Sequence, residues 1–268
     1  MTWSSQVTYL HLRMIKLLDL LKEIKNKPKA IFLAGPAGSG KTFTSAQIIP
    51  KTLSVINVDD TYEELLKAAG LGLKVADFTQ DQLSQAGKLM GQAQKATKEK
   101  YAQLSAAKNN IVVDGTGAAS KPLLKKKQDL EALGYECMMV MIYVSPLTSL
   151  QRNQERGEKE GRSLMPSIIL RTWRDVNKNI DIFKQEFKDN FILINNDPEE
   201  ATKEFSPELT RPYFETSKAK GKPKTPEEIA KSKAEKEQIN KDIENMVKTL
   251  PKFDTLDSAK SKINEFIS

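Results

Sequence analysis

The sequence predicts an α/β protein: a central parallel β-sheet with helices on both faces, plus an N-terminal helix and a helical C-terminal extension. Three observations lead to this fold class. Short apolar runs alternate with helical patterns up to about residue 197, as in parallel sheets with right-handed crossovers. A glycine-rich turn follows the first run. Carboxylates follow the second and third runs, and ligands of such sheets bind beyond the carboxyl ends of the strands.

Five segments have the composition of buried strands. β-branched and large apolar residues dominate them, and turn-forming residues or helix starts bound them. The expected strands are Ala30–Ala34, Leu53–Val58, Asn110–Asp114, Glu136–Val144 and Phe191–Asn195.

Helical periodicity fills the intervals between these runs. Pro146 opens one helix at its first turn, and Gly70 and Gly134 end two others. An apolar stripe at helical spacing from Ile169 to Phe187 predicts one continuous helix before the last strand. The expected helices are Phe43–Ile49, Thr61–Ala69, Asp81–Lys108, Lys121–Leu133, the helix that begins at Pro146, and the helix that carries this stripe.

The terminal regions differ from this alternating part. An apolar seam predicts an amphipathic helix over Val7–Lys25, which packs on the chain's own body or drives dimerisation. Ser206–Pro226 is rich in proline and lysine and predicts a flexible or extended linker, followed by helices to about Leu250 and over Thr255–Phe266. We therefore divide the chain into an N-terminal helix (residues 1–27), a central domain (residues 28–200) and a linker with a helical C-terminal extension (residues 201–268).

Composition narrows the classes of function. Lys and Arg number 42 against 35 Asp and Glu, a net charge of +7 that is compatible with phosphate-rich substrates. The chain has one cysteine, Cys137, and one histidine, His11, which argues against a disulfide framework, a zinc site and a Ser-His-Asp triad. No run has the length of a membrane span and no signal-peptide pattern opens the chain, so we expect a cytoplasmic protein with no membrane partner. The sequence does not indicate an oligomeric state.

The glycine-rich turn has the pattern G-x-x-x-x-G-K-T, which is a phosphate-binding loop when a strand precedes it and a helix follows. Both flanks are present. The glycines let backbone amides curl around an anion at the positive end of a helix dipole. Lys41 is expected to bind the β- and γ-phosphates of ATP, and the Thr42 hydroxyl to coordinate Mg²⁺, as in the three-layer P-loop NTPase fold. The loop consists of Gly35, Pro36, Ala37, Gly38, Ser39, Gly40, Lys41 and Thr42.

Three carboxylates at the predicted strand ends are candidates for phosphoryl-transfer chemistry. Asp59 and Asp60 follow the second strand, where one could orient an acceptor hydroxyl and take its proton. One of the two could instead cap the helix that follows. Asp114 ends the third strand, where it could hold Mg²⁺, contact the acceptor, or only form the turn before Gly115.

Arginines gather in the charged segment after the fourth strand. Arg152 and Arg156 lie four residues apart on one helical face, and Arg162 lies in a run with glycines at both ends. This pattern is typical of a mobile lid whose arginines close over a triphosphate and stabilise the transition state. A solvated charged turn would have the same composition.

The order of these motifs resembles the P-loop kinases of the polynucleotide kinase and zeta toxin branch, over about residues 29–195. The segments that carry the resemblance are GPAGSGKT, INVDDTY, VVDGT, LQRNQERG and GRSLMP. Similarity to the N-x-D-D pattern of polynucleotide kinases implies that Asp59 is the general base. Similarity to their K-R-N-x-x-R-G segment implies that Arg152 and Arg156 are lid arginines.

Similarity to zeta toxins implies somewhat different roles. Their D-T-F segment selects Asp60 as the base, and their acid-Gly-Thr motif matches Asp114. Their paired lid arginines match Arg156 and Arg162. The chain departs from polynucleotide kinases at Tyr62, where those enzymes have an arginine that grips the 3′-phosphate of the acceptor. This departure weakens the case for a nucleic-acid acceptor.

These features together predict an ATP- and Mg²⁺-dependent kinase. The acceptor hydroxyl would belong to a nucleic-acid end, a nucleoside, or a nucleotide-sugar such as the UDP-sugar that the resemblance to zeta toxins implies. A different class of function, a nucleotide-binding ATPase or switch that acts through a partner protein, has the same phosphate loop.

Overall fold

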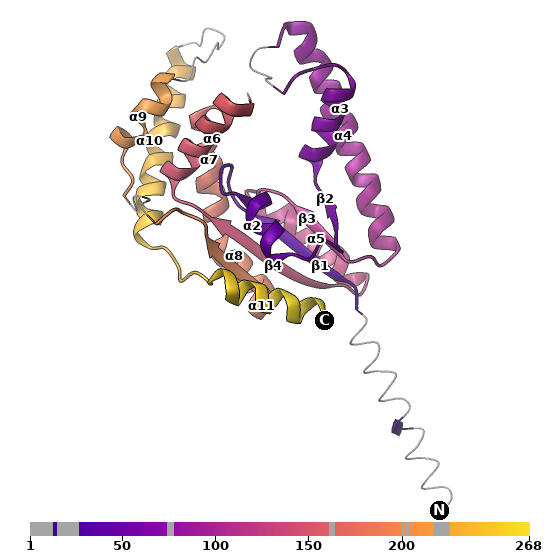
Figure 1. The fold of residues 1–268 in the computed structure, drawn as a ribbon. Coiled ribbons are helices and arrows are strands. Elements are labelled where there is room, and N and C mark those ends of the chain that lie inside the picture. Colours follow the sequence, from indigo (N-terminus) through magenta and orange to yellow (C-terminus); the bar gives the residue numbers. More distant parts are fainter. Residues whose placement is uncertain are drawn as a thin grey trace, which may run out of the picture.

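The computed structural model describes residues 13–14, 27–73, 78–160, 164–199, 201, 204–216 and 226–268. Its centre is a five-stranded parallel sheet in the order β2-β3-β1-β4-β5 (Figure 1). The predicted fold class is confirmed. The strands are β1 (Lys29–Ala34), β2 (Ser54–Ile56), β3 (Ile111–Asp114), β4 (Glu136–Tyr143) and β5 (Phe191–Asn195).

The pairing of the central strand β1 determines where the functional loops meet. Parallel register joins Leu33 of β1 to Asp114 of β3, so the two strands end side by side. Two backbone hydrogen bonds extend this pairing: Gly115 N donates to Leu33 O at 3.1 Å, and Gly35 N donates to Thr116 O at 3.0 Å. The loop after β1 and the turn after β3 are therefore held against each other.

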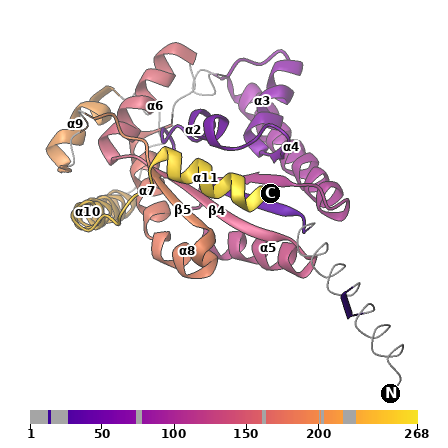
Figure 2. The same ribbon diagram turned by 60° about the horizontal axis from the view of Figure 1, so that its bottom comes forward.

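The helices are α2 (Lys41–Ile48), α3 (Val58–Ala68), α4 (Gln80–Ala106), α5 (Ser120–Ala132), α6 (Pro146–Glu160), α7 (Pro166–Asn177), α8 (Ile180–Phe187), α9 (Pro207–Thr216), α10 (Pro226–Lys248) and α11 (Leu256–Ile267). They cover both faces of the sheet (Figure 2). Successive residues of β1 and β4 point to opposite faces and belong to two separate hydrophobic clusters. α5, α7 and α8 pack on one face, and α2 and α11 on the other.

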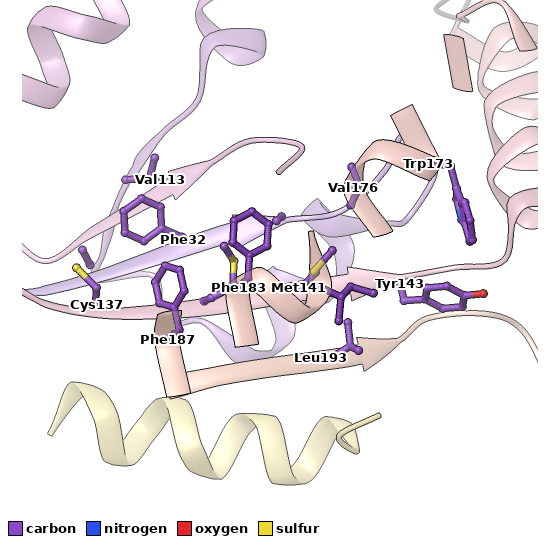
Figure 3. Close-up of a cluster of buried hydrophobic side chains, with 14 of the residues drawn as sticks. Phe32, Val113, Cys137, Met141, Tyr143, Trp173, Val176, Phe183, Phe187 and Leu193 are labelled. Carbon is purple, nitrogen blue, oxygen red and sulfur yellow. The ribbon is translucent and has the colours of Figure 1, made fainter. Parts of the chain in front are cut away.

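The larger cluster is rich in aromatic residues (Figure 3). Phe32 of β1 packs edge-on against Phe187 of α8, with ring centroids 5.6 Å apart. Trp173 of α7 is fully buried, and its indole N–H donates to Val144 O at 2.7 Å, which satisfies the polar group of this side chain. Cys137 is buried here, and burial raises the pKa of its thiol to about 12. A thiol with this pKa is protonated at neutral pH, and the thiolate is the reactive form.

α3 and α4 form a helical pair on the β2 side of the sheet (Figure 1). Leu66 of α3 is buried in a small cluster with Ala86 of α4 and with Leu71, which follows α3. Thr79 and Gln82 form a capping box at the start of α4, which explains why this long polar helix begins there. Within the described ranges, no helix has both the length and the apolar character to cross a membrane.

The C-terminal extension packs on the central domain. α10 lies along α7, where Ile243 is buried, Arg171 pairs with Glu235 at 2.8 Å, and Lys178 pairs with Asp242 at 2.8 Å. The boundary drawn at residue 200 stays a prediction, although the extension shares both hydrophobic clusters with the preceding residues.

α11 completes the second face of the sheet (Figure 2). Ile263 and Phe266 are buried against β-strand residues beside α2. Just before α11, the backbone N–H of Asp254 donates to Leu193 O at 2.7 Å, and its carboxylate accepts from Leu193 N at 3.0 Å. These bonds attach the start of α11 to the edge strand β5.

Some segments differ from their predicted structure. The continuous helix predicted from the apolar stripe is split into α7 and α8, and at the break the Asn179 side chain donates to the carbonyls of Gly117 and Ala118. Part of the predicted linker forms α9, because the partly buried Phe214 packs against the larger cluster and this contact supports a helix that composition alone disfavours. The predicted N-terminal helix lies outside the described residues except for residues 13–14.

If α11 is part of the core, Ile263→Ala should lower the free energy of unfolding by about 2–4 kcal/mol, because the substitution leaves a cavity under the sheet. Urea unfolding followed by circular dichroism measures this change. Lys260→Ala, at an exposed position on the same helix, is the matched control. Equal unfolding midpoints for Ile263→Ala and the control would contradict this role of α11.

Candidate active site

The phosphate loop joins β1 to α2 and depends on glycine at three positions. Gly35, Gly38 and Gly40 have φ values of 155°, 75° and 75°, a region that other residues rarely adopt. Space is also restricted. A side-chain carbon on Gly38 would lie 2.8 Å from Ser149 O, and one on Gly40 would lie 2.5 Å from Asn196 Nδ2. The sequence pattern therefore reflects both the turn of the backbone and close packing on its outer side.

Lys41 begins α2 and folds back over the loop, where its ammonium donates to Gly35 O at 2.7 Å. Burial lowers the pKa of Lys41, and the nearby carboxylates of Asp114 and Asp59 oppose this change, whereas Arg156 adds to it. Residues from α2, β3, α3 and α6 thus lie within electrostatic reach of one ammonium group. The structure brings together four of the predicted site residues.

Asp114 lies at the end of β3, partly buried, and its two carboxylate oxygens have different surroundings. Oδ2 accepts a hydrogen bond from Asn57 Nδ2 at 2.8 Å. Oδ1 is buried and has no hydrogen-bond partner among the described residues. Burial is the largest cause that raises the pKa of Asp114 to about 6; Asp60 and Asp59 raise it further, and Lys41 lowers it.

Asp59 and Asp60 occupy the first turn of α3 rather than the end of a strand. α3 begins at Val58, three residues before the predicted start, because Asn57 caps it by accepting from Asp59 N at 2.8 Å. Both carboxylates remain exposed. Neither is the helix cap that the sequence left open as an alternative.

Asn57 is a site residue that the sequence analysis missed. Its side chain caps α3 through Oδ1 and binds Asp114 through Nδ2, so one amide links the helix that carries the acidic pair to the end of β3. The preference of asparagine for the N-cap position was a signal that could have identified it.

The arginines of α6 lie on two sides of the loop. Arg156 Nη2 lies 3.8 Å from Glu63 Oε1 of α3, so it extends across the site toward the acidic pair. Arg152 instead contacts the loop itself: Nη1 donates to Gly38 O at 3.2 Å, and Nη2 donates to Asn196 O at 3.0 Å. Arg162 lies outside the described residues, and α6 continues to Glu160.

Tyr62 packs within the α3–α4 cluster, next to the acidic pair in sequence. Its partly buried ring contributes to holding α3 on α4. This role accounts for an aromatic residue at the position where the resembling polynucleotide kinases have an arginine.

Two side-chain oxygens, one on α2 and one at the end of β3, are of the chemical kind that magnesium prefers as ligands. Mg²⁺ in phosphate-transfer sites takes one or two protein oxygens together with substrate phosphates and water. The exposed Thr42 hydroxyl in the first turn of α2 and the unpaired Oδ1 of Asp114 are oxygens of this kind. Among the described residues, no three His, Cys, Asp or Glu side chains form a complete metal cage.

Comparison with known proteins places this fold and site in a family. The zeta toxin family model matches residues 17–204, about 70% of the chain. The chain belongs to the zeta toxin family. This match confirms the resemblance that the motifs indicated. It also confirms that the protein is of the P-loop phosphotransferase class. No curated protein matches it in sequence.

Solved structures share the fold at low identity. AvrRxo1-ORF1:-ORF2 with ATP matches at 14% identity and a TM-score of 0.52, covering 90% of this chain and 80% of that chain. The PezAT toxin-antitoxin system of Streptococcus pneumoniae gives a match at 21% identity and a TM-score of 0.46, covering 64% and 68%. The Pnkp1/Rnl/Hen1 RNA repair complex gives one at 18% identity and a TM-score of 0.45, covering 58% and 46%.

The raised pKa of Asp114 predicts a pH-dependent cost to stability. In the folded protein the Asp114 carboxyl group keeps its proton up to about pH 6, whereas in the unfolded chain it releases the proton near the ordinary pKa of 3.8. The contribution of this group to stability is therefore greatest below pH 3.8 and is lost as the pH rises through 6.

Asp114→Asn should remove this cost. Relative to the wild type, its free energy of unfolding should increase by on the order of 2 kcal/mol more at pH 7.5 than at pH 4.5, because each pKa unit corresponds to about 1.4 kcal/mol. Urea unfolding in magnesium-free buffer measures the difference. Glu64→Gln, which changes an exposed carboxylate on α3, is the matched control. If Asp114→Asn differs from the wild type by the same free energy of unfolding at pH 4.5 and at pH 7.5, the raised pKa is contradicted.

Proposed function

We propose that this protein is an ATP-dependent kinase that transfers the γ-phosphate to a hydroxyl group of a nucleotide-type acceptor, with a nucleotide-sugar as the first candidate. The observation that carries the proposal is the convergence of Lys41, Asp59, Asp114 and Arg156 beside a glycine-rich loop. A loop alone binds nucleotide. Carboxylates and an arginine beside it supply what phosphoryl transfer to a hydroxyl also requires.

The phosphate loop would bind the donor. Backbone amides of residues 35–42 and the N-terminus of α2 would surround the phosphates of ATP. Lys41 would exchange its bond to Gly35 O for oxygens of the β- and γ-phosphates. Thr42 and Asp114 would hold Mg²⁺, which, when bound, neutralises charge that develops on the phosphates.

One carboxylate of the acidic pair would activate the acceptor. As the acceptor oxygen bonds to the γ-phosphorus, its proton passes to Asp59 or Asp60, the bond to the β-phosphate oxygen breaks, and ADP leaves. The electrostatic effect of Asp59 on Lys41 favours Asp59, since the base must lie near the γ-phosphate. The zeta toxin motif D-T-F favours Asp60. Both remain candidates.

The α6 arginines would act on the donor side. Arg156 extends toward the acidic pair and would stabilise charge on the transferred phosphoryl group. Arg152, which was predicted to bind ATP, contacts Gly38 O of the loop and would act on the donor through the loop. The lid role of Arg162 stays a prediction.

The nature of the acceptor is inferred from two observations. Membership of the zeta toxin family favours a nucleotide-sugar. Tyr62, whose ring packs in the α3–α4 cluster, offers no cation for the 3′-phosphate of a nucleic-acid end. Nucleic-acid 5′-hydroxyls and nucleosides are therefore the competing acceptors in the experiment that follows.

Transfer of labelled γ-phosphate from ATP should label a nucleotide-sugar such as a UDP-sugar, and should label RNA ends or nucleosides far less. The purified full chain is incubated with each acceptor, and ATP hydrolysis without acceptor is measured in parallel. Hydrolysis that proceeds fully without acceptor, and that no acceptor accelerates, would contradict a kinase and indicate an ATPase or switch.

Asp59→Asn and Asp60→Asn should separate the two candidates for the base. Loss of the general base should slow single-turnover phosphate transfer by about 10²-fold or more, whereas the other substitution should slow it less than tenfold. Glu64→Gln, one turn further along α3, is the control. If both aspartate variants retain the wild-type rate, neither residue is the base.

A further inference from the structure

The outer side of the phosphate loop is held by side chains from outside the motif. Three consecutive loop carbonyls are each bound by one side chain. Ser149 Oγ of α6 donates to Ala37 O, and Arg152 Nη1 donates to Gly38 O at 3.2 Å. Asn196 directly follows β5, and its Nδ2 donates to Ser39 O at 2.8 Å. We call Ser149, Arg152 and Asn196 the loop clamp.

The members of the clamp are fixed by the body of the protein. Asn196 N donates to Tyr143 O at 2.9 Å, and the backbone carbonyl Asn196 O accepts from Arg152 Nη2 at 3.0 Å, so the Arg152 side chain is joined to the main chain of Asn196. Ser149 is fully buried in the second turn of α6. Asp197 adds a further link, because its carboxylate accepts from Ser145 N at 2.8 Å. The clamp therefore connects the loop to rigid elements on two sides.

Holding these carbonyls fixes the direction of the amides. In a trans peptide the C=O and the N–H of the next residue point in opposite directions. The carbonyls of Ala37 and Ser39 face the clamp, so the N–H groups of Gly38 and Gly40 face the other way, toward the inside of the loop. The close approach of Ser149 to Gly38 and of Asn196 to Gly40 shows that the clamp and the glycines fit together.

We propose that Ser149, Arg152 and Asn196 are positioning residues that keep the phosphate loop in its phosphate-binding form, and that Arg152 acts through the loop carbonyl and Asn196 rather than as a charge on the nucleotide. The inference rests on the proposed binding of ATP by this loop. It assigns a role to Asn196 and Ser149, which no motif indicates.

The test compares nucleotide affinity between variants of the full chain. Dissociation constants for ATP and ADP with Mg²⁺ are measured by titration calorimetry, and thermal unfolding without nucleotide checks that each variant folds. Asn196→Ala should raise both constants about tenfold, because one hydrogen bond that orients the loop is lost. Asn196→Asp should bind more weakly still, since a carboxylate would face Ser39 O without a proton to donate.

Arg152→Lys separates a clamp from a charge contact. Lysine keeps the positive charge but lacks the planar pair of donors that bridges Gly38 O and Asn196 O. It should therefore lose about as much affinity as Arg152→Ala. In the double variant Arg152→Ala/Asn196→Ala, the loss should be smaller than the product of the single losses, because both residues act on one loop.

Controls and outcomes distinguish this inference from the proposed function. Asn195→Ala is the matched control, since that exposed side chain accepts only from Asp197 N among the described residues. Ser149→Ala removes a single hydroxyl group. Its affinity for ATP tests the clamp if another clamp variant fails to fold. Wild-type protein that does not bind ATP would overturn the proposed function. Wild-type binding together with unchanged affinity in Asn196→Ala, or full retention in Arg152→Lys, would overturn the clamp.

Discussion

Parallel pairing of β1 with β3 and β4 is the interaction on which the functional edge of this protein depends. It brings the end of β1, where the phosphate loop begins, level with Asp114 at the end of β3. Backbone hydrogen bonds between Gly35 and Thr116 and between Gly115 and Leu33 carry this alignment beyond the strands. The phosphate loop and the acidic pair therefore lie in short loops or first helical turns that directly follow the strands at this edge of the sheet.

Electrostatic coupling follows from that alignment. The ammonium of Lys41 and the carboxylate of Asp114 lie close enough for each to shift the pKa of the other toward its charged form, while burial shifts both in the opposite direction. Asn57 contributes by binding Asp114 and capping α3 with one side chain. A buried charge is costly unless it is paired. A site that places a buried ammonium beside a buried carboxylate in this way is consistent with the proposed binding of ATP and Mg²⁺.

α6 takes part in the site on two sides. Its first turns hold the outside of the phosphate loop through Ser149 and Arg152, and Arg156 reaches α3 on the opposite side. α7 and the C-terminal extension pack behind it: α9 lies beside α6, and α10 beside α7. Movement of α6 would therefore change the loop and the arginine together. The extension, which the family match does not cover beyond residue 204, supports this helix layer and completes the core through α11.

Periodicity and glycine spacing are local properties of the chain, so the sequence alone was enough to predict the alternating α/β fold and the phosphate loop. Tertiary structure decided what depends on distant segments. The break at Asn179, the helix at residues 207–216 and the link between Asn57 and Asp114 arise from contacts across the fold. Asn196 lies 157 residues from the loop carbonyl that it binds, a separation that no local pattern can encode.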